Sequence, residues 1–336
     1  MMGKSLSAGI LLVGLCAAFP AAAQEPAKLR WGVAVSSSLS QAPAPMLELD
    51  KEIQARHGLE FTTVDFKGNV TGCIAAVISG EVDVCQNGIS IGMNAIAQGG
   101  DLVAFMQLIG QINEITLTPD AIARIGVGPE APVGDRIAAL KGLTIAGPGA
   151  GSTTYSILEA ILAEAGLAPP DLVYQPLTDI TALNASLSNK RIDAAIWSVG
   201  GLSPAQSDGS GLRYINLASG EIPHLLAVPN VASFAPRKFV EDNRESLQRV
   251  QAAFVDVVAT LRADPFGYAA PYKAAYLPDL PQAIWEDNLP QAVAAYFADV
   301  EGSREGWDFW VKHLPVDDPA ARDRVAYDAA YVRLSQ

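Results

Sequence analysis

A strand–helix–strand–helix–strand order occurs twice along the chain, and this repeat constrains the fold more than any other feature. In the first copy, the apolar runs at 29–35, 59–66 and 82–85 read as strands, and helical spacing occurs at 43–57 and 70–79. In the second copy, strands are expected at 143–146, 172–174 and 192–196, and helices at 152–165 and 180–188. Short connections in this order are typical of a parallel sheet with helices on its faces. The sequence therefore predicts an α/β fold with two parallel-sheet lobes.

The two copies align at an offset of 110 residues, which places Asp83 on Asp193 and Gly99 on Gly209. A gene duplication and convergence on one βαβαβ unit would both produce this similarity, and the sequence leaves the two origins open. The paired aspartates either belong to a functional site or fix the neighbouring backbone. We expect the second role for both.

The path between the lobes follows from the segments that lie outside the two copies. Apolar runs at 103–107 and 122–127 read as strands that carry the chain out of the first lobe and into the second, and residues 212–228 bring it back. We therefore expect a two-crossing hinge, with lobe 1 formed by 24–118 and 225–336 and lobe 2 by 119–224. Helices expected at 239–262, 281–300, 306–313 and 318–334 would form an outer layer on lobe 1.

The first 23 residues have the pattern of a cleaved secretory signal, with Lys4 ahead of an apolar run at 8–19 and small residues at 21–23. This pattern predicts a soluble protein that is exported to the periplasm. An oxidising compartment permits Cys73 and Cys85 to pair. Both cysteines also lie in apolar segments, where separate buried thiols are equally compatible with the sequence.

Charge and motif content argue against several classes of function. The formal net charge is −13 at pH 7, whereas nucleic acids and anionic membranes attract clustered Lys and Arg. The histidines His57, His224 and His313 have no metal-ligand spacing, so no metal is expected. The one approximate nucleophile elbow, at 149–153, lacks the glycine after the serine. We expect a binding protein without catalytic residues or a cofactor.

Polar and aromatic residues follow the expected strands at four places. In open parallel sheets, ligands bind beyond the carboxyl ends of the strands. The candidate ligand-binding residues are Ser36, Ser37, Ser38, Asn87, Gly88, Gly151, Ser152, Thr153, Thr154 and Trp197. Each has a structural alternative, since the glycine-rich turn with a serine cap is ordinary before a helix, Asn-Gly is a common turn pair, and a tryptophan is often part of a core.

Two segments resemble the periplasmic binding proteins of ABC importers for sulfonates, nitrate, taurine and thiamine-pyrimidine precursors. Residues 70–88, with the Gly-Glu-Val-Asp sequence at 80–83, are similar to the Ala-Leu … Gly-x-x-Asp segment of these proteins. Leu-Lys-Gly at 140–142 is similar to the start of their strand that leads into a Gly-Ser-Thr turn, which here lies at 151–153. The similarity spans roughly residues 29–260.

The resemblance implies a type II periplasmic binding protein that works as a monomer with the membrane permease of an ABC importer. It implies a small organic solute clamped between the lobes at Ser36 to Ser38, Asn87, Ser152, Thr153 and Trp197. No arginine stands in these loops, which favours a carboxylate or a planar aromatic solute over a sulfonate or nitrate. The alternatives are an exported enzyme of the same fold and a TRAP-type or sensory solute binder.

Overall fold

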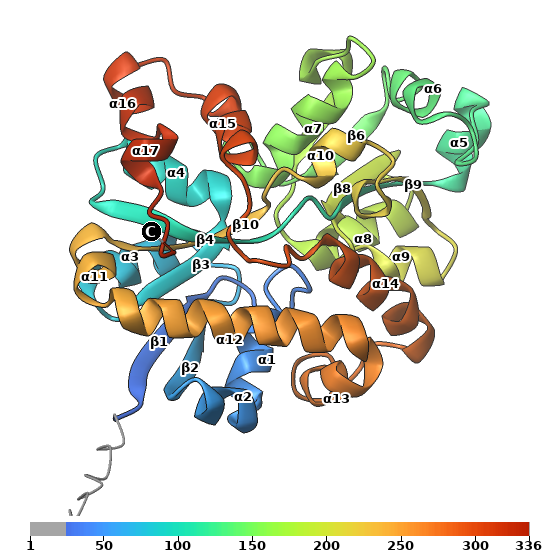
Figure 1. Ribbon diagram of the computed structural model, residues 1–336. Coiled ribbons are helices and arrows are strands. Elements are labelled where there is room, and N and C mark those ends of the chain that lie inside the picture. The colour runs from blue at the N-terminus through green and yellow to red at the C-terminus, as the bar shows by residue number, and fades with distance from the viewer. Residues whose placement is uncertain (1–24, 336) are drawn as a thin grey trace, which may run out of the picture.

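The computed structural model describes residues 25–335 and contains two five-stranded sheets (Figure 1). The first sheet has the order β2-β1-β3-β10-β4, with β1 (Ala27–Val33), β2 (Leu59–Asp65), β3 (Val84–Gly88), β4 (Leu102–Ile109) and β10 (Val231–Pro236). The second has the order β7-β6-β8-β5-β9, with β5 (Asn113–Leu117), β6 (Thr144–Gly147), β7 (Val173–Pro176), β8 (Ala194–Ser198) and β9 (Leu212–Asn216). The expected signal segment at 1–23 lies outside the described residues.

Each sheet has one antiparallel strand, which differs from the all-parallel expectation. Strand β10 runs antiparallel to β3 and β4, and β5 runs antiparallel to β8 and β9. Both strands enter their sheet directly from the other lobe. They do not follow a helical crossover, which is the connection that parallel neighbours require. The expected α/β class with two lobes is confirmed, and the antiparallel strands mark where the chain crosses.

The helices that follow the strands of the first sheet are α1 (Pro43–Leu49), α2 (Lys51–Arg56), α3 (Val70–Ser79) and α4 (Ile89–Ala97). The single helix expected at 43–57 is divided at Asp50, whose side chain accepts hydrogen bonds from Glu52 N (3.0 Å) and Ile53 N (2.9 Å) and so caps α2. The second sheet carries α5 (Pro119–Ile125), α6 (Val133–Ala138), α7 (Thr153–Ala163), α8 (Ile180–Ser188), α9 (Ser203–Ser207) and α10 (Pro223–Leu226). Two short 3₁₀ helices lie at Pro169–Asp171 and Leu217–Ser219.

The strand expected at 122–127 is wrong, because this segment forms helix α5. Thr118 caps the helix by accepting a hydrogen bond from Ala121 N (3.2 Å), Pro119 is its first residue, and Gly126 ends it with φ +70°. The strand that enters the second sheet is β5, which directly precedes α5 in the chain. The crossing therefore lies at residues 110–112, ahead of the expected boundary at residue 118.

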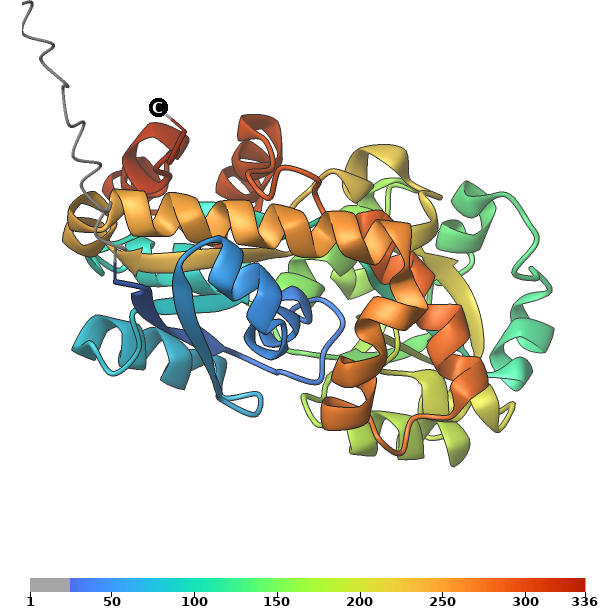
Figure 2. The ribbon, with the colours of Figure 1, turned by 60° about the horizontal axis from the view of Figure 1, so that its bottom comes forward.

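The C-terminal third is helical, as expected. Its helices are α11 (Arg237–Asp242), α12 (Arg244–Ala263), α13 (Pro265–Tyr276), α14 (Gln282–Ala295), α15 (Arg304–His313), α16 (Pro319–Arg324) and α17 (Tyr327–Ala330). Helix α12 runs the length of the first sheet, whereas α13 and α14 reach the second lobe (Figures 1 and 2). The layer thus covers lobe 1 and also bridges to lobe 2. No helix within residues 25–335 has the length and apolarity needed to cross a lipid bilayer.

A cluster of aromatic rings fixes α12 on the first sheet. Helix α12 turns Leu247, Val250 and Phe254 inward at helical spacing, and the Phe254 ring lies 5.4 Å from that of Trp31 on β1. Phe61 and Phe105 pack on the same tryptophan at 5.4 and 6.0 Å between ring centroids. This core packs α12 against β1, with β2 and β4 contributing Phe61 and Phe105 to it.

The paired aspartates have the structural role that we expected. Asp83 accepts from Arg30 N (2.8 Å) and binds the Arg30 guanidinium (2.7 Å), while Asp193 accepts from Thr144 N (2.9 Å) and pairs with Arg124 (2.6 Å). Each carboxylate therefore ties the start of its own strand to a neighbouring strand. Cys73 and Cys85, which the sequence left open, form a disulfide between α3 and β3 with a Cα–Cα distance of 5.7 Å.

Candidate functional site

The loop after β3 in the first lobe meets the loop after β6 in the second. Ser90 Oγ lies 2.9 Å from Thr153 Oγ1 and 3.4 Å from the Gly151 carbonyl, to which Asn94 Nδ2 also donates at 3.5 Å. A Cβ atom added at Gly88 would lie 2.8 Å from Thr153 Oγ1. The predicted site residues Gly88, Gly151 and Thr153 are therefore brought together across the two lobes.

A second contact between the lobes lies beside the loop after β1. The turn after β8 passes this loop at Gly200, where φ is +93°. A Cβ atom at Gly200 would be 3.9 Å from Leu39 Cδ1 of lobe 1 and 3.5 Å from Asn288 Nδ2 of α14. All four predicted loop ends thus lie at or next to interlobe contacts.

The first contact joins the beginnings of two helices. Helix α4 starts at Ile89 and helix α7 at Thr153, so the positive ends of both helix dipoles lie at the interface. Ser152 Oγ accepts from Tyr155 N (3.1 Å), as expected for a cap. The predicted site residues carry hydroxyl, amide and indole groups and no formal charge. Such a surface binds polar or anionic groups through hydroxyls and backbone N–H donors.

The serines after β1 differ in their surroundings. Ser36 is buried, its carbonyl accepts from Tyr272 Oη (2.8 Å), and among the described residues its own Oγ has no hydrogen-bond partner. Ser38 Oγ bonds to Ser40 Oγ (2.9 Å), and Ser37 is exposed. A buried hydroxyl without a partner is costly, so Ser36 is the serine here best suited to contact a solute.

Asn87 is committed to the fold of its own lobe. Its Nδ2 donates to the Val70 carbonyl (2.8 Å), and its Oδ1 accepts from Gly88 N (2.8 Å). The side chain is fully buried. We assign Asn87 to holding the β3–α4 turn, and through it Gly88, in place.

Trp197 is half-buried and packs largely within lobe 2. A Cβ atom at Gly201 would lie 2.1 Å from its Cδ1, so the indole covers that glycine, and Leu202 and Ala205 belong to the same apolar cluster. A different aromatic pair lies beside the glycine-rich turn. There Tyr155 meets Tyr174 edge to face at 5.1 Å, and Tyr174 Oη donates to the Pro148 carbonyl (2.7 Å).

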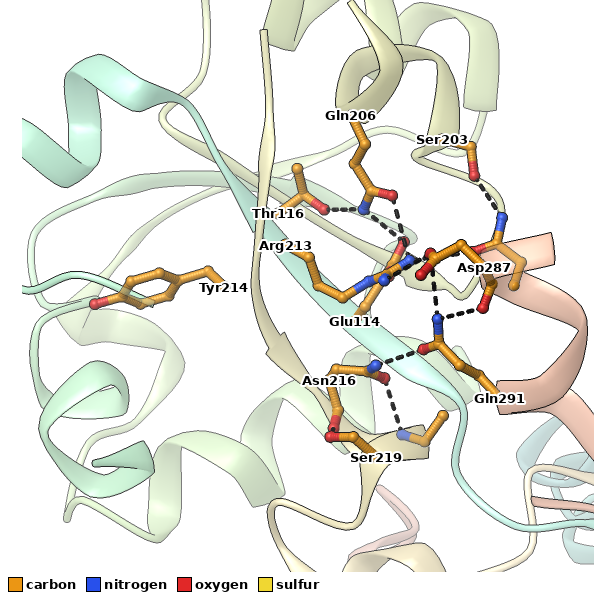
Figure 3. Close-up of polar contacts among 12 residues, drawn as sticks. Glu114, Thr116, Ser203, Gln206, Arg213, Tyr214, Asn216, Ser219, Asp287 and Gln291 are labelled. Atoms are coloured by element: carbon orange, nitrogen blue, oxygen red, sulfur yellow. Dashed lines mark hydrogen bonds and ion pairs between the residues drawn. The ribbon is translucent and has the colours of Figure 1, made fainter. Parts of the chain in front are cut away.

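A buried ion pair in lobe 2 was not found from the sequence (Figure 3). Glu114 on β5 is fully buried and accepts from Arg213 Nε (2.5 Å) and Gln206 Nε2 (3.0 Å). Burial raises the pKa of Glu114 above its ordinary value, and the charge of Arg213 opposes that rise. The glutamate stands opposite Trp197 in the register of β5 and β8, so it supports the strand that carries this tryptophan.

The same arginine links lobe 2 to helix α14. Arg213 Nη1 donates to Asp287 Oδ2 (2.8 Å) and Nη2 to Asn288 Oδ1 (3.1 Å), while Asn288 Nδ2 donates to Ser203 Oγ (2.8 Å). Asn216 Nδ2 donates to Gln291 Oε1 (2.5 Å), which completes the network shown in Figure 3. Helix α14 is therefore fastened to lobe 2 by polar contacts. No spacing in the sequence indicates this link, since its members lie up to 177 residues apart, between Glu114 and Gln291.

Ser90 and Asn94 were not among the residues predicted to form the site. Both lie on the first turns of α4, a helix that we did not predict. The signal was present, because the run Ile89, Met93 and Ile96 has helical spacing directly after Gly88.

Solved structures share this fold at low sequence identity. The alkanesulfonate-binding protein SsuA from Xanthomonas axonopodis pv. citri bound to MOPS matches with a TM-score of 0.67 and 22% identity, over 93% of this chain and 100% of that chain. The periplasmic aliphatic sulphonate binding protein SsuA from Escherichia coli matches with a TM-score of 0.66 and 20% identity, over 86% of both chains. The periplasmic nitrate-binding protein NrtA from Synechocystis PCC 6803 matches with a TM-score of 0.64 and 12% identity, over 91% of this chain and 86% of that chain.

A search of curated protein sequences finds no match. A family model does match, under the description "NMT1/THI5 like", and it covers residues 55–266. This range includes β2 to β10 and both sides of the interlobe contact at Gly88 and Thr153. On this match over more than half of its length, the chain belongs to the NMT1/THI5-like family.

Proposed function

We propose that this protein is a periplasmic solute-binding protein that captures a small organic solute between its two lobes and delivers it to the permease of an ABC importer. The observation that carries the proposal is the meeting of Gly88 and Ser90 from one lobe with Gly151 and Thr153 from the other. The proposal treats the protein as a monomer with no cofactor. The neighbours with this fold include proteins that bind alkanesulfonates and nitrate.

The chemistry of the loops supports a carboxylate, a sulfonate or a planar heterocycle as the solute. Two helix N-termini and the hydroxyls of Ser36, Ser90 and Thr153 provide donors for an anionic group. Tyr155 and Trp197 are half-buried aromatic residues in the same lobe, and they provide flat apolar surface for a ring. Because no charged side chain is among the predicted site residues, we favour a carboxylate or an aromatic solute over a small inorganic anion.

Capture by hinge closure is the mechanism that this architecture supports. The chain passes between the sheets at residues 110–112 and again between β9 and β10, and α14 is tied to lobe 2 through Arg213 and Asn288. A rotation at these segments that carries α14 with lobe 2 separates Ser90 from Thr153. A solute that contacts both loops binds the closed arrangement more tightly than the open one. It therefore shifts the population toward the form that a permease recognises.

A thermal-stability screen identifies the solute class. We expect one member of a panel of carboxylates, sulfonates, pyrimidines and aromatic acids to stabilise the folded protein by about 2.7 kcal/mol at 100 times its dissociation constant. The solute should be recovered chemically unchanged after incubation. Conversion into a product would instead indicate an enzyme of the same fold.

The variant Gly88→Leu tests whether the solute lies between the lobes. Its side chain would fill the space next to Thr153, where even a Cβ atom is only 2.8 Å from the hydroxyl, so we expect at least a 30-fold loss of affinity by calorimetry. Gly134→Leu is the matched control, because no atom lies within 4 Å of the Cβ position at Gly134. Equal affinities of the two variants would place the solute elsewhere.

A further inference from the structure

Three amide side chains join the two crossings between the lobes. Gln111 lies on the outgoing crossing, Asn113 is the first residue of β5, and Asn230 lies on the return, just ahead of β10. Gln111 Oε1 accepts from Asn113 Nδ2 at 2.8 Å and from Asn230 Nδ2 at 2.9 Å. Gln111 Nε2 donates to the carbonyls of Val228 and Pro229, both at 3.2 Å. All three amides are buried, so this group is part of the packed interior where the chain passes between the lobes (Figure 1).

The orientation of the Asn113 amide follows from these contacts. The carbonyls of Val228 and Pro229 can only accept hydrogen bonds, so the NH₂ group of Gln111 faces them. The Gln111 oxygen therefore faces the two asparagines, and a reversed Asn113 amide would set two oxygens against each other. Asn113 Nδ2 is the group that faces Gln111, and Asn113 Oδ1 is free to accept a hydrogen bond from elsewhere.

Asn113 Oδ1 has no donor within the part of the chain that the structure describes. The atom is buried, and no residue from 25 to 335 donates a hydrogen bond to it. A buried amide oxygen without a donor costs about 1–3 kcal/mol. The amide group at the crossings thus fixes one hydrogen-bond acceptor that the described residues do not use.

Asn113 lies on the face of the second sheet that helix α7 covers. Successive side chains of a strand point to opposite faces. Glu114, the next residue, bonds to Gln206 of α9 on one face. Ile115 lies on the Asn113 face and belongs to the same apolar cluster as Ile157 of α7. The Asn113 side chain is therefore on the same side of the sheet as α7.

Asn113 also lies at the edge of this sheet where α7 begins. It pairs with Ser198, the last residue of β8, and β8 runs parallel to β6. The carboxyl ends of β6 and β8 therefore meet the same edge, and α7 starts after β6 at Thr153. In lobe 1, the Asn230 carbonyl accepts from Ile89 N (3.0 Å) at the start of α4. The amide group thus connects the two sides of the interlobe contact.

We propose that Asn113 is a specificity-determining residue of the interlobe site, and that its Oδ1 accepts a hydrogen bond from an N–H or O–H group of the solute. The inference rests on the proposed function, because it needs a solute between the lobes. The N-termini of α4 and α7 supply donors for an acidic group, and Asn113 supplies an acceptor, so the site matches a solute that carries both kinds of group. Nitrate and simple alkanesulfonate anions have only acceptor oxygens, and they would leave Asn113 Oδ1 unpaired.

Calorimetric titration with pairs of compounds that differ by one donor tests this inference. The pairs are glycolate and acetate, p-hydroxybenzoate and benzoate, and pyrrole carboxylate and furan carboxylate. In a pair that binds, we expect the donor-bearing member to bind the wild type about tenfold more tightly than the other member. Asn113→Leu keeps the approximate size of the side chain and removes the acceptor, so the two members should bind this variant with affinities within about twofold of each other.

The matched control is Asn230→Leu, which removes the other donor to Gln111 Oε1 and leaves Asn113 Oδ1 in place. It should change the affinity for both members of a pair by the same factor, so the preference for the donor-bearing member should remain. Should Asn113→Leu fail to fold by circular dichroism, Asn113→Ala replaces it. Alanine also removes the acceptor, and the same loss of preference is expected.

Equal affinities for both members in the wild type, or a preference that persists in Asn113→Leu, would overturn the inference and leave solute capture between the lobes intact. A preference that is also lost in Asn230→Leu would overturn it, because the amide group would then act only by holding the crossings together. Binding by none of these compounds would overturn the proposed function for small carboxylates, and this inference with it.

Discussion

Replacing Arg213 with methionine is expected to lower the free energy of unfolding by about 3–5 kcal/mol at pH 8. Glu114 is fully buried, and Arg213 is its charged partner in the ion pair that the structure shows. Without the guanidinium, an ionised carboxylate remains in the interior of lobe 2, and Asp287 and Asn288 of α14 lose their contacts with β9. Urea unfolding followed by circular dichroism measures the change.

The deficit of Arg213→Met should shrink as the pH falls. Burial raises the pKa of Glu114 above its ordinary value of 4.5, and loss of Arg213 removes the charge that opposes this rise. Between pH 4.5 and the raised pKa, the folded variant binds a proton that the unfolded chain does not. Folding of the variant is therefore favoured as the pH drops through the raised pKa, and the destabilisation is largest above it.

Two controls separate a buried charge from a general loss of packing. Arg124→Met breaks the ion pair with Asp193, in which the arginine side chain is 56% exposed, and it should cost about 1 kcal/mol or less. The double variant Glu114→Leu with Arg213→Met removes both charges and should recover much of the lost stability. A single variant at Arg213 that costs no more than the Arg124 variant, with no pH dependence, would contradict a buried role for Glu114.

Replacing Gly110 with alanine is expected to destabilise the protein by about 3–5 kcal/mol, because the added methyl group meets backbone and not a movable side chain. A Cβ atom at Gly110 would lie 1.9 Å from the carbonyl oxygen of Leu226. Gly110 lies on the outgoing crossing, Leu226 on the return, and Gly110 N donates to the Ala295 carbonyl (2.9 Å) at the end of α14. The hinge is therefore a place where three segments pack without room for a side chain.

The matched control for the hinge is Gly134→Ala in α6, where no atom lies within 4 Å of the Cβ position. Alanine in an open helical position should leave stability unchanged or raise it slightly. Denaturant unfolding of both variants decides the question. Equal midpoints would show that the two crossings are not packed as the structure has them.

Much of the fold follows from local sequence signals. The helices at 70–79 and 180–188 have the expected bounds, because apolar residues at helical spacing there are flanked by a polar cap on one side and a turn on the other. The equivalence of Asp83 and Asp193 also holds in three dimensions. Each aspartate accepts a hydrogen bond from a backbone N–H of a neighbouring strand, at 2.8 Å from Arg30 of β1 and 2.9 Å from Thr144 of β6.

Strand β5 was missed because its pattern is set by partners far away in the sequence. It carries Asn113, Glu114 and Thr116 in a position where every residue is buried, and polar residues of this kind argue against a buried strand when read alone. In the folded chain, Arg213 and Gln206 bind Glu114, Gln206 also donates to Thr116, and Asn113 Nδ2 donates to Gln111 Oε1 (2.8 Å). The apolar residues at 122–127 were therefore predicted to be the strand, although a cap at Thr118, a proline at 119 and a glycine at 126 are the signals of a helix.

The sequence predicted which loops form the candidate site, but it did not predict which atoms in those loops contact one another. Strand ends identified Gly88, Gly151 and Thr153, which the structure brings together. They did not reveal that Asn87 uses both its Nδ2 and its Oδ1 within lobe 1, or that the hydroxyl of Ser90 on α4 contacts Thr153. The Asn87 contacts depend on how α3 packs beside β3, and the Ser90–Thr153 contact depends on the relative placement of the lobes; no local pattern encodes either.

Solute binding by the double variant Ser90→Cys, Thr153→Cys tests most directly whether the solute binds between the lobes. The two side-chain oxygens are 2.9 Å apart in the native protein, so the paired thiols are within reach of a disulfide that would hold the lobes together. Wild type, in which Cys73 and Cys85 are already paired, is treated with the same oxidant and reductant. The oxidised variant is predicted to exclude added solute and to regain wild-type affinity on reduction. A cross-linked protein that binds solute with undiminished affinity and rate would contradict an interlobe site.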